Sequence, residues 1–333
     1  MALLFQPLGH PSSPASEICY GSQTMALLFH SSVDSAARWS EQLTRLMPGL
    51  DIRVWPQIGD SAAIDYALVW RPRPGLLASL PKLKLILSLG AGVDHILLDP
   101  LLPRNVPIVR LVDPYLTEAM SEYVVLQVLR LHRQDLEYRA QQQAGVWREL
   151  PQKNAGERPV GILGFGEIGQ DAARKLKALG FPVTGWGRGE RTVAGFATFA
   201  GGVGLPRLLA QSEILVCLLP LTAETEGILN TRTFAALPKG AGLVNAGRGR
   251  HLVEQDLIPA LDSGQLSAAA LDVFREEPLP PDHPFWHHPR IVVTPHTAGT
   301  TNPATAAPIV LDTIRRLEAG RPLLNQVDPA RGY

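Results

Sequence analysis

Three residues of this chain combine a chemically useful side chain with a position just after an apolar run: Arg248, Glu277 and His296. Arginine can bind a carboxylate through two N–H groups, and an imidazole can transfer a proton near neutral pH. Taken one at a time, Arg248 could be a surface cation, Glu277 a solvated carboxylate and His296 a hydrogen-bonded residue in a turn. Their order along the chain, downstream of a glycine-rich loop, favours one shared functional site.

The glycine-rich loop follows the apolar run Val160–Leu163, which predicts a buried strand. Gly164, Gly166 and Gly169 stand in the spacing G-x-G-x-x-G, and an apolar helical pattern comes next. In this motif the first glycine allows the turn, the second admits a pyrophosphate and the third lets helix pack on strand. A glycine-rich turn in some other α/β protein is the alternative. The strand predicted after the helix supplies the required context, so we predict a dinucleotide site.

A second glycine turn, Gly90-Ala91-Gly92-Val93, follows the strand predicted at residues 83–89. Its backbone N–H groups could bind a carboxylate, and an ordinary tight turn is the alternative reading. Open α/β sheets bind ligands beyond the carboxyl ends of their strands. Both glycine turns and the three chemical residues are expected at such ends.

The remaining pattern alternates short apolar runs with helical segments, which predicts parallel βαβ units. Strands are predicted at residues 26–29, 51–55, 66–70, 83–89, 108–111, 160–163, 182–186, 214–219, 242–245, 268–273 and 291–294. Helices are predicted at residues 35–47, 76–80, 117–143, 205–211, 232–237, 255–263 and 305–318. The segment 117–143 contains no Gly or Pro, and so long a helix could bridge two domains or pack against a partner.

Length and composition limit the class of protein. The chain has 333 residues, no formal net charge, and no long basic or acidic block, so neither nucleic acid nor a membrane is an expected partner. Its two cysteines, Cys19 and Cys217, exclude a disulfide framework and favour the reducing cytoplasm. Residues 1–24 are rich in Pro, Ser and Gly, and Met25 to Phe29 repeats Met1 to Phe5. We therefore expect residues 1–24 to be a mobile extension that precedes the folded domain.

From residue 25 to the end, the chain resembles the D-isomer-specific 2-hydroxyacid dehydrogenases. Residues 88–94, 271–280 and 326–333 look like the branch of that family that reduces glyoxylate and hydroxypyruvate. The resemblance implies an α/β fold of two Rossmann-like domains with the active site in the cleft between them, and a homodimer. Residues 25–117 and 300–333 would form the substrate domain, and residues 118–299 the NAD(P)-binding domain.

The resemblance also implies roles for the three chemical residues. Arg248 would bind the substrate carboxylate, and His296 would donate a proton to the forming alkoxide. Glu277 would hydrogen-bond the other ring nitrogen and favour the charged imidazole. Substrate contacts are expected from Trp70, Ala91, Gly92, Val93 and Arg248. Cofactor contacts are expected from Met120, Gly164, Phe165, Gly166, Glu167, Ile168, Arg188, Arg191, Leu219, Pro220, Ala246, Gly247, Asp272, His296 and Gly299.

The cofactor is expected to be NADPH, with NADH as a weaker alternative. An NAD enzyme places an acid about twenty residues after the glycine loop, at the end of the second strand. Here Arg188 and Arg191 follow that strand, and an arginine suits a 2′-phosphate. Glu190 is the opposing feature, because a carboxylate turned inward would weaken the preference for NADPH.

The expected substrates are small 2-oxo acids, with glyoxylate reduced to glycolate and hydroxypyruvate to D-glycerate. Trp70, Arg71, Trp147 and Trp286 could line a tight pocket, although each Trp could equally be core or interface. Another 2-oxo acid, or a non-catalytic nucleotide sensor on the same scaffold, remains an alternative. No metal is expected, because His283, His287 and His288 lie in a Pro-interrupted loop without a second set of ligands.

Overall fold

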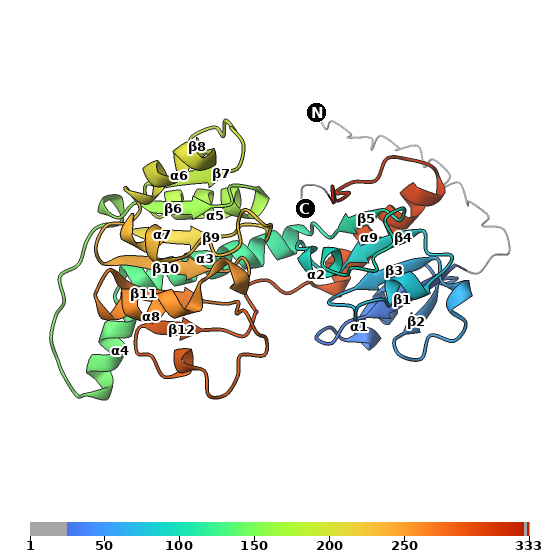
Figure 1. Ribbon diagram of the computed structural model, residues 1–333, viewed down its shortest axis with the longest axis horizontal. Helices are drawn as coiled ribbons and strands as arrows, with labels where there is room; N and C mark the ends of the chain where they lie inside the picture. The colour runs from blue at the N-terminus through green and yellow to red at the C-terminus, as the bar shows by residue number, and fades with distance from the viewer. Residues whose placement is uncertain (1–24, 330–331, 333) are drawn as a thin grey trace, which may run out of the picture.

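The computed structural model describes residues 25–329 and 332, so the expected extension at residues 1–24 lies outside the described residues. Two bodies, each built on a parallel β-sheet, lie side by side and are joined by a long helix and one loop (Figure 1). We name them the five-stranded domain and the seven-stranded domain. The expected α/β class with two Rossmann-like domains is confirmed.

The five-stranded domain has the strand order β2-β1-β3-β4-β5. Its strands are β1 (Ala26–His30), β2 (Asp51–Val54), β3 (Tyr66–Val69), β4 (Leu85–Ser88) and β5 (Ile108–Arg110). One face is covered by α1 (Ala36–Leu46) and α9 (Pro303–Glu318), which bury Trp39, Leu43, Val310 and Ile314 against the sheet. The other face is covered by α2 (Asp94–Leu97) and the single turns η1 (Ser61–Ala63) and η2 (Leu77–Ser79). The C-terminal helix therefore packs on the first sheet of the chain.

The seven-stranded domain has the strand order β12-β11-β10-β9-β6-β7-β8. Its strands are β6 (Val160–Leu163), β7 (Val183–Gly187), β8 (Ala197–Ala200), β9 (Ile214–Cys217), β10 (Ala241–Asn245), β11 (Leu266–Leu271) and β12 (Ile291–Val293). Its helices and single turns are α3 (Pro114–His132), α4 (Asp135–Gln143), η3 (Ala155–Glu157), α5 (Glu167–Ala178), α6 (Gly201–Leu209), α7 (Thr231–Ala235), η4 (Gly249–His251), α8 (Glu254–Asp262) and η5 (Pro284–Trp286). Helices α3 and α5 bury one face of the sheet, and α6, α7 and α8 bury the other. Cys217 is fully buried on the face covered by α6, α7 and α8.

The single long helix predicted at residues 117–143 is wrong, because the structure has two helices there. Helix α3 ends at His132, and α4 starts at Asp135 after Gln134 adopts a left-handed φ of 55°. The break is stabilised by Asp135, whose Oδ2 accepts from Arg130 Nε at 3.0 Å and from Arg139 Nε at 2.8 Å. No Gly or Pro stands at Gln134, so the helical pattern of the sequence continues across the break without a signal. Strand β8 was also not predicted.

The chain crosses between the domains twice, through α3 and through the segment between β12 and α9 (Figure 1). Helix α3 begins beside the five-stranded sheet, with Asp113 as its N-cap and Pro114 in its first turn, and continues under the other sheet. Among the described residues, no helix is both long and apolar enough to span a membrane. The two crossings hold the carboxyl ends of both sheets toward a shared cleft.

Candidate active site

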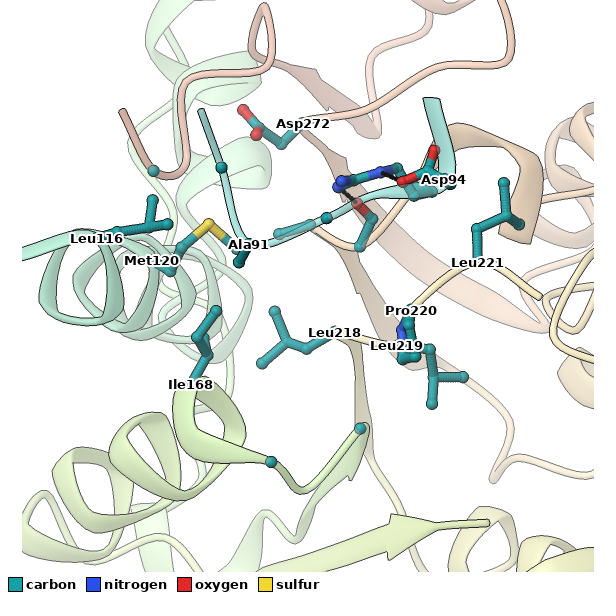
Figure 2. A pocket seen from close by; sticks show the side chains of 18 of the residues that line it. Ala91, Asp94, Leu116, Met120, Ile168, Leu218, Leu219, Pro220, Leu221 and Asp272 are labelled. Atoms are coloured by element: carbon teal, nitrogen blue, oxygen red, sulfur yellow. Dashed lines mark hydrogen bonds and ion pairs between the residues drawn. The ribbon is translucent and has the colours of Figure 1, made fainter. Parts of the chain in front are cut away.

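One cavity of about 2180 Å³ lies between the two domains. Its walls are the segments that follow strands of both sheets, such as residues 89–94 after β4 and residues 246–248 after β10. Figure 2 shows Ala91 and Asp94 from the five-stranded domain opposite Leu218, Leu219 and Pro220 from the seven-stranded domain. Every residue expected to contact substrate or cofactor lines this cavity. This is the ligand position of open α/β sheets.

The glycine loop is shaped for close approach of a ligand. Gly164 has a φ of 94°, and a Cβ there would lie 2.6 Å from the Leu218 carbonyl oxygen. A Cβ on Gly169 would overlap the Gly164 carbonyl oxygen, so that glycine lets α5 pack on the turn. Gly166, in contrast, has no atom within 4 Å of its Cβ position. That open cradle stands at the N-terminus of α5, where no side chain caps the helix, and it fits a pyrophosphate.

The cavity is also lined by three charged residues that follow β7, namely Arg188, Glu190 and Arg191. Arg191 donates through Nη1 to the Phe165 carbonyl oxygen at 3.3 Å. Phe165 itself is buried, and its ring lies where a side chain on Gly185 would be. Phe165 therefore offers its backbone to the cavity, and its ring belongs to the core.

The wall beside α3 is apolar. Leu116 and Met120 project from α3, with Ile168 at the start of α5 nearby (Figure 2). A Cβ on Gly299 would lie 2.5 Å from Met120 Cγ, so only glycine allows the loop to pass this close. A planar aromatic ring of a cofactor suits such a wall better than a charged group does.

His296 and Glu277 form a hydrogen-bonded pair. His296 Nδ1 lies 2.8 Å from Glu277 Oε2, and Glu277 Oε1 accepts the Phe274 N–H at 2.9 Å. Burial alone would raise the pKa of Glu277, but the hydrogen bond and charge of His296, the Phe274 N–H and Arg71 outweigh it and hold that pKa at about 2. An ionised carboxylate only accepts hydrogen bonds, so Nδ1 carries a proton. The other ring nitrogen, Nε2, remains for proton exchange with a ligand in the cavity.

The loop that carries His296 is anchored by Asp272, which is 1% exposed. Its carboxylate accepts the N–H groups of Thr297 and Ala298, each at 2.9 Å, and the hydroxyl of Thr294 at 2.6 Å. The Asp272 carbonyl oxygen accepts the His296 N–H at 2.8 Å. His296 has a φ of 54°, and this network holds it in that uncommon conformation. Asp272 thus lines the cavity, but its carboxylate bonds to the loop that carries His296.

Arg248 reaches across the cleft to the five-stranded domain. Its Nε donates to Asp94 Oδ1 at 2.9 Å, and its Nη1 donates to the Gly247 carbonyl oxygen at 2.8 Å. Burial raises the pKa of Asp94, but the charge and hydrogen bond of Arg248 outweigh burial and lower that pKa below its usual 3.8. The guanidinium lies against the Gly90–Val93 turn, since a Cβ on Gly92 would be 2.6 Å from Arg248 Cζ. A carboxylate bound here would meet the guanidinium and bare backbone N–H groups together.

Comparison with known proteins agrees with this geometry. Residues 125–298 match the family model of the D-isomer specific 2-hydroxyacid dehydrogenase, NAD binding domain. The chain is also 43% identical over 314 residues to the glyoxylate/hydroxypyruvate reductase A of Yersinia enterocolitica. That match covers 93% of this chain and all of the Yersinia protein. This chain is a D-isomer-specific 2-hydroxyacid dehydrogenase family member.

Solved structures of the family share the whole fold. The D-isomer specific 2-hydroxyacid dehydrogenase of Xanthobacter autotrophicus, in complex with NADPH and MES, has a TM-score of 0.88 and 44% identity. The NADPH-dependent glyoxylate/hydroxypyruvate reductase of Sinorhizobium meliloti, in complex with NADP and sulfate, has a TM-score of 0.88 and 41% identity. Each comparison covers 93% of this chain and all of the other. The match extends over both domains.

Two histidines of this dehydrogenase site, the fully buried His251 and the half-buried His95, were not predicted. His251 Nδ1 accepts the Arg248 N–H at 3.0 Å, and burial lowers the pKa of His251 to about 4, so its ring is neutral. His95 packs on Trp70 with ring centroids 4.3 Å apart, and burial lowers its pKa to about 3. Neutral His251 thus supports the backbone of Arg248, and neutral His95 packs against the Trp70 ring. The sequence shows His251 three residues after Arg248, but that spacing alone does not indicate its role.

The aromatic residues expected around the substrate divide into two groups. Trp70, Arg71 and Trp286 line the dehydrogenase cavity, and the Trp70 ring lies edge-on to His296 with centroids 6.1 Å apart. Trp147 neither lines this cavity nor belongs to the core, because it follows α4 and is 100% exposed, and of the three readings of the sequence the interface remains. The break at Gln134 and the loop after α4 direct this segment away from the cleft.

Proposed function

We propose that this dehydrogenase family member reduces small 2-oxo acids with NADPH, glyoxylate to glycolate and hydroxypyruvate to D-glycerate. The observation that carries the proposal is the convergence of Arg248, Glu277 and His296 on one cavity that also holds the glycine cradle. The relatives named for glyoxylate and hydroxypyruvate support this substrate class.

The proposed division of labour follows from the geometry. Arg248 and the turn at residues 90–93 bind the substrate carboxylate, and Asp94 keeps the guanidinium aimed. NADPH, when bound, supplies a hydride to the keto carbon. His296 gives the Nε2 proton to the keto oxygen, and the charge of Glu277 stabilises the protonated imidazole before that transfer. No acid or base outside this set is required.

NADPH is proposed over NADH because of the residues after β7. Arg188 and Arg191 line the cavity there, and no acid stands at the end of the strand to bind a ribose hydroxyl. Glu190 lines the same wall, and two arginines outnumber its charge. The two family structures described above hold NADPH or NADP, which supports the same preference.

We also propose a homodimer in the cytoplasm. The arm formed by α4 and the segment after it exposes Tyr138, Val146 and Trp147, and α3 exposes Leu126. Large apolar side chains grouped on one arm suit a subunit contact.

The proposed domain division is residues 25–117 with 300–333 for the substrate and residues 118–299 for the cofactor. The buried, unpaired Cys217 is compatible with a reducing compartment.

The test is a set of initial rates with NADPH and NADH against glyoxylate, hydroxypyruvate, pyruvate and phenylpyruvate. We expect fast NADPH oxidation that is confined to the two small acids. Preference for phenylpyruvate would point to another 2-oxo acid, and preference for NADH would overturn the role of the arginines. Absence of turnover together with NADPH binding would indicate a nucleotide sensor. His296→Ala should lose most turnover and keep NADPH binding, and full activity in that variant would remove the proton-donor assignment.

A further inference from the structure

One oxygen of Glu277 serves two cationic groups. Glu277 Oε2 lies 2.8 Å from His296 Nδ1 and 2.5 Å from Arg71 Nη2. The other oxygen, Oε1, is occupied by the Phe274 N–H. Arg71 and His296 therefore share a single acceptor. Because both nitrogens bond the same oxygen, the distance between them cannot exceed the sum of the two bond lengths. Two positive groups this close to each other repel, so each disfavours the charged form of the other.

The position of Arg71 is specified by the fold. It directly follows Trp70 after β3 and has a φ of 46°, a left-handed conformation that L residues rarely adopt. Its guanidinium carbon lies 6.0 Å from the centre of the Trp70 ring, and its side chain is 40% exposed. Glu277 is the one acidic partner of Arg71 among residues 25–329. A strained backbone that places a cation against a largely buried carboxylate is typical of a functional position.

The contact also joins the two domains. Arg71 belongs to the five-stranded domain, whereas Glu277 and His296 belong to the seven-stranded domain, 206 residues from Arg71 in the case of Glu277. Any widening of the cleft would separate Arg71 from Glu277 and leave the bond within the Glu277–His296 pair intact. The second cation on the shared oxygen therefore comes from the opposite domain.

The remaining charged groups around His296 do not duplicate this effect. Asp272 is saturated by Thr294, Thr297 and Ala298. Arg248 is paired with Asp94 across the cleft. The burial-lowered pKa of His95, about 3, leaves that ring neutral. Within the described part of the chain, Arg71 is thus the one further cation bonded to the carboxylate that His296 uses.

We propose that Arg71 is a positioning residue for proton transfer: it binds the Glu277 oxygen that His296 uses and so weakens the hold of that carboxylate on the His296 proton. A carboxylate bonded to one cation stabilises a protonated imidazole strongly, and a second cation on the same oxygen reduces that stabilisation. With Arg71 bound to Glu277, His296 is the better acid. The inference rests on the proposed proton-donor role of His296.

The test compares Arg71→Gln and Arg71→Lys with wild type across the pH range of glyoxylate reduction. The reduction needs protonated His296, so the rate falls as pH rises through its titration. Removing Arg71 strengthens the hold of Glu277 on the proton, and the high-pH fall in kcat/KM should move upward by about one pH unit in Arg71→Gln. Arg71→Lys keeps the charge and should restore most of the wild-type profile.

Arg73→Gln is the matched control, because Arg73 lies two residues away, stacks on Trp55 at 4.3 Å from the ring centre and does not line the cavity. Its profile should match that of wild type. A purely structural role of Arg71 would change Tm or the amplitude of the rate and leave the profile in place. An unmoved profile in folded Arg71→Gln, or a shift to lower pH, would overturn the proposal.

A second readout does not depend on turnover. Histidine NMR of the cofactor-free protein, with His296 assigned by loss of its signal in His296→Ala, follows the protonation of the ring directly. The titration midpoint of His296 should rise in Arg71→Gln and stay in place in Arg73→Gln. If wild type reduces no 2-oxo acid, the proposed function fails while this titration still decides the role of Arg71. An identical midpoint in Arg71→Gln and wild type would refute it.

Discussion

Gly92→Ala tests whether the turn at residues 90–93 and Arg248 together bind the substrate carboxylate. The added Cβ would fall on Arg248 Nη2 and lie 2.6 Å from its Cζ. Gly92 itself does not require a left-handed φ, so alanine is compatible with its backbone. The substitution therefore acts mainly on the position of the guanidinium, and the other close atom is Asp94 Oδ1 at 3.2 Å, the acceptor of the same arginine.

The expected effect is large on activity and small on stability. The atoms that the new methyl meets are the far end of a flexible side chain, which can swing away at a folding cost of about 1 kcal/mol, a Tm change of about 2–4 °C. Displacing the guanidinium removes a charged hydrogen bond to substrate, worth about 1.5–3 kcal/mol. That is a fall of about 10- to 150-fold in kcat/KM.

The assay is kcat/KM for glyoxylate, with Tm and NADPH affinity measured on the same samples. Gly49→Ala is the control, because its Cβ position has no atom within 4 Å and lies in the turn after α1. We expect Gly49→Ala to match wild type in all three measurements. A Gly92→Ala enzyme with kcat/KM within twofold of wild type would show that the guanidinium is not held where substrate binds.

Three further predictions concern the cofactor and the buried histidine. Gly166→Ala fills the open cradle at the start of α5 without meeting any atom, so Tm should be unchanged while the Kd for NADPH, measured by fluorescence titration, rises about tenfold; an unchanged Kd would remove the pyrophosphate from this position. Arg188→Ala should raise the KM for NADPH about tenfold or more and leave that for NADH nearly constant, and equal changes for both cofactors would contradict a contact with the 2′-phosphate. Burial lowers the pKa of His251 from 6.5 to about 4, so its contribution to stability is complete above pH 6.5 and is lost as pH falls toward 4, with an upper value of about 3 kcal/mol. Urea unfolding at pH 7.5 and pH 5 should therefore show a larger acid-induced loss for wild type than for His251→Asn, and equal losses in both proteins would refute this linkage.

Much of the fold follows from local sequence. The segment from Val160 to Gly169 specifies strand, turn and helix. The turn requires the left-handed φ that Gly164 adopts, and α5 begins at Gly166 without a side-chain cap. Apolar runs of four to six residues predicted most strands of both sheets, since strands buried on both faces carry continuous apolar sequence. Residue types at strand ends then indicated Arg248, Glu277 and His296 before any contact between them was known.

The sequence by itself determined the two-sheet α/β class, the nucleotide loop and the chemical types of the site residues. Tertiary structure alone decided the helix break at Gln134, the outward position of Trp147 and the pairs that cross the cleft. Arg248 and Asp94 are 154 residues apart, and Arg71 and Glu277 are 206 residues apart. Periodicity and turn chemistry report on neighbours within a few residues, whereas these pairs depend on how two separately folded sheets face each other. The sharing of Glu277 Oε2 follows from that packing, because Arg71 and Glu277 belong to different domains. The proton on His296 Nδ1 follows from the Glu277–His296 pair, which forms within the seven-stranded domain.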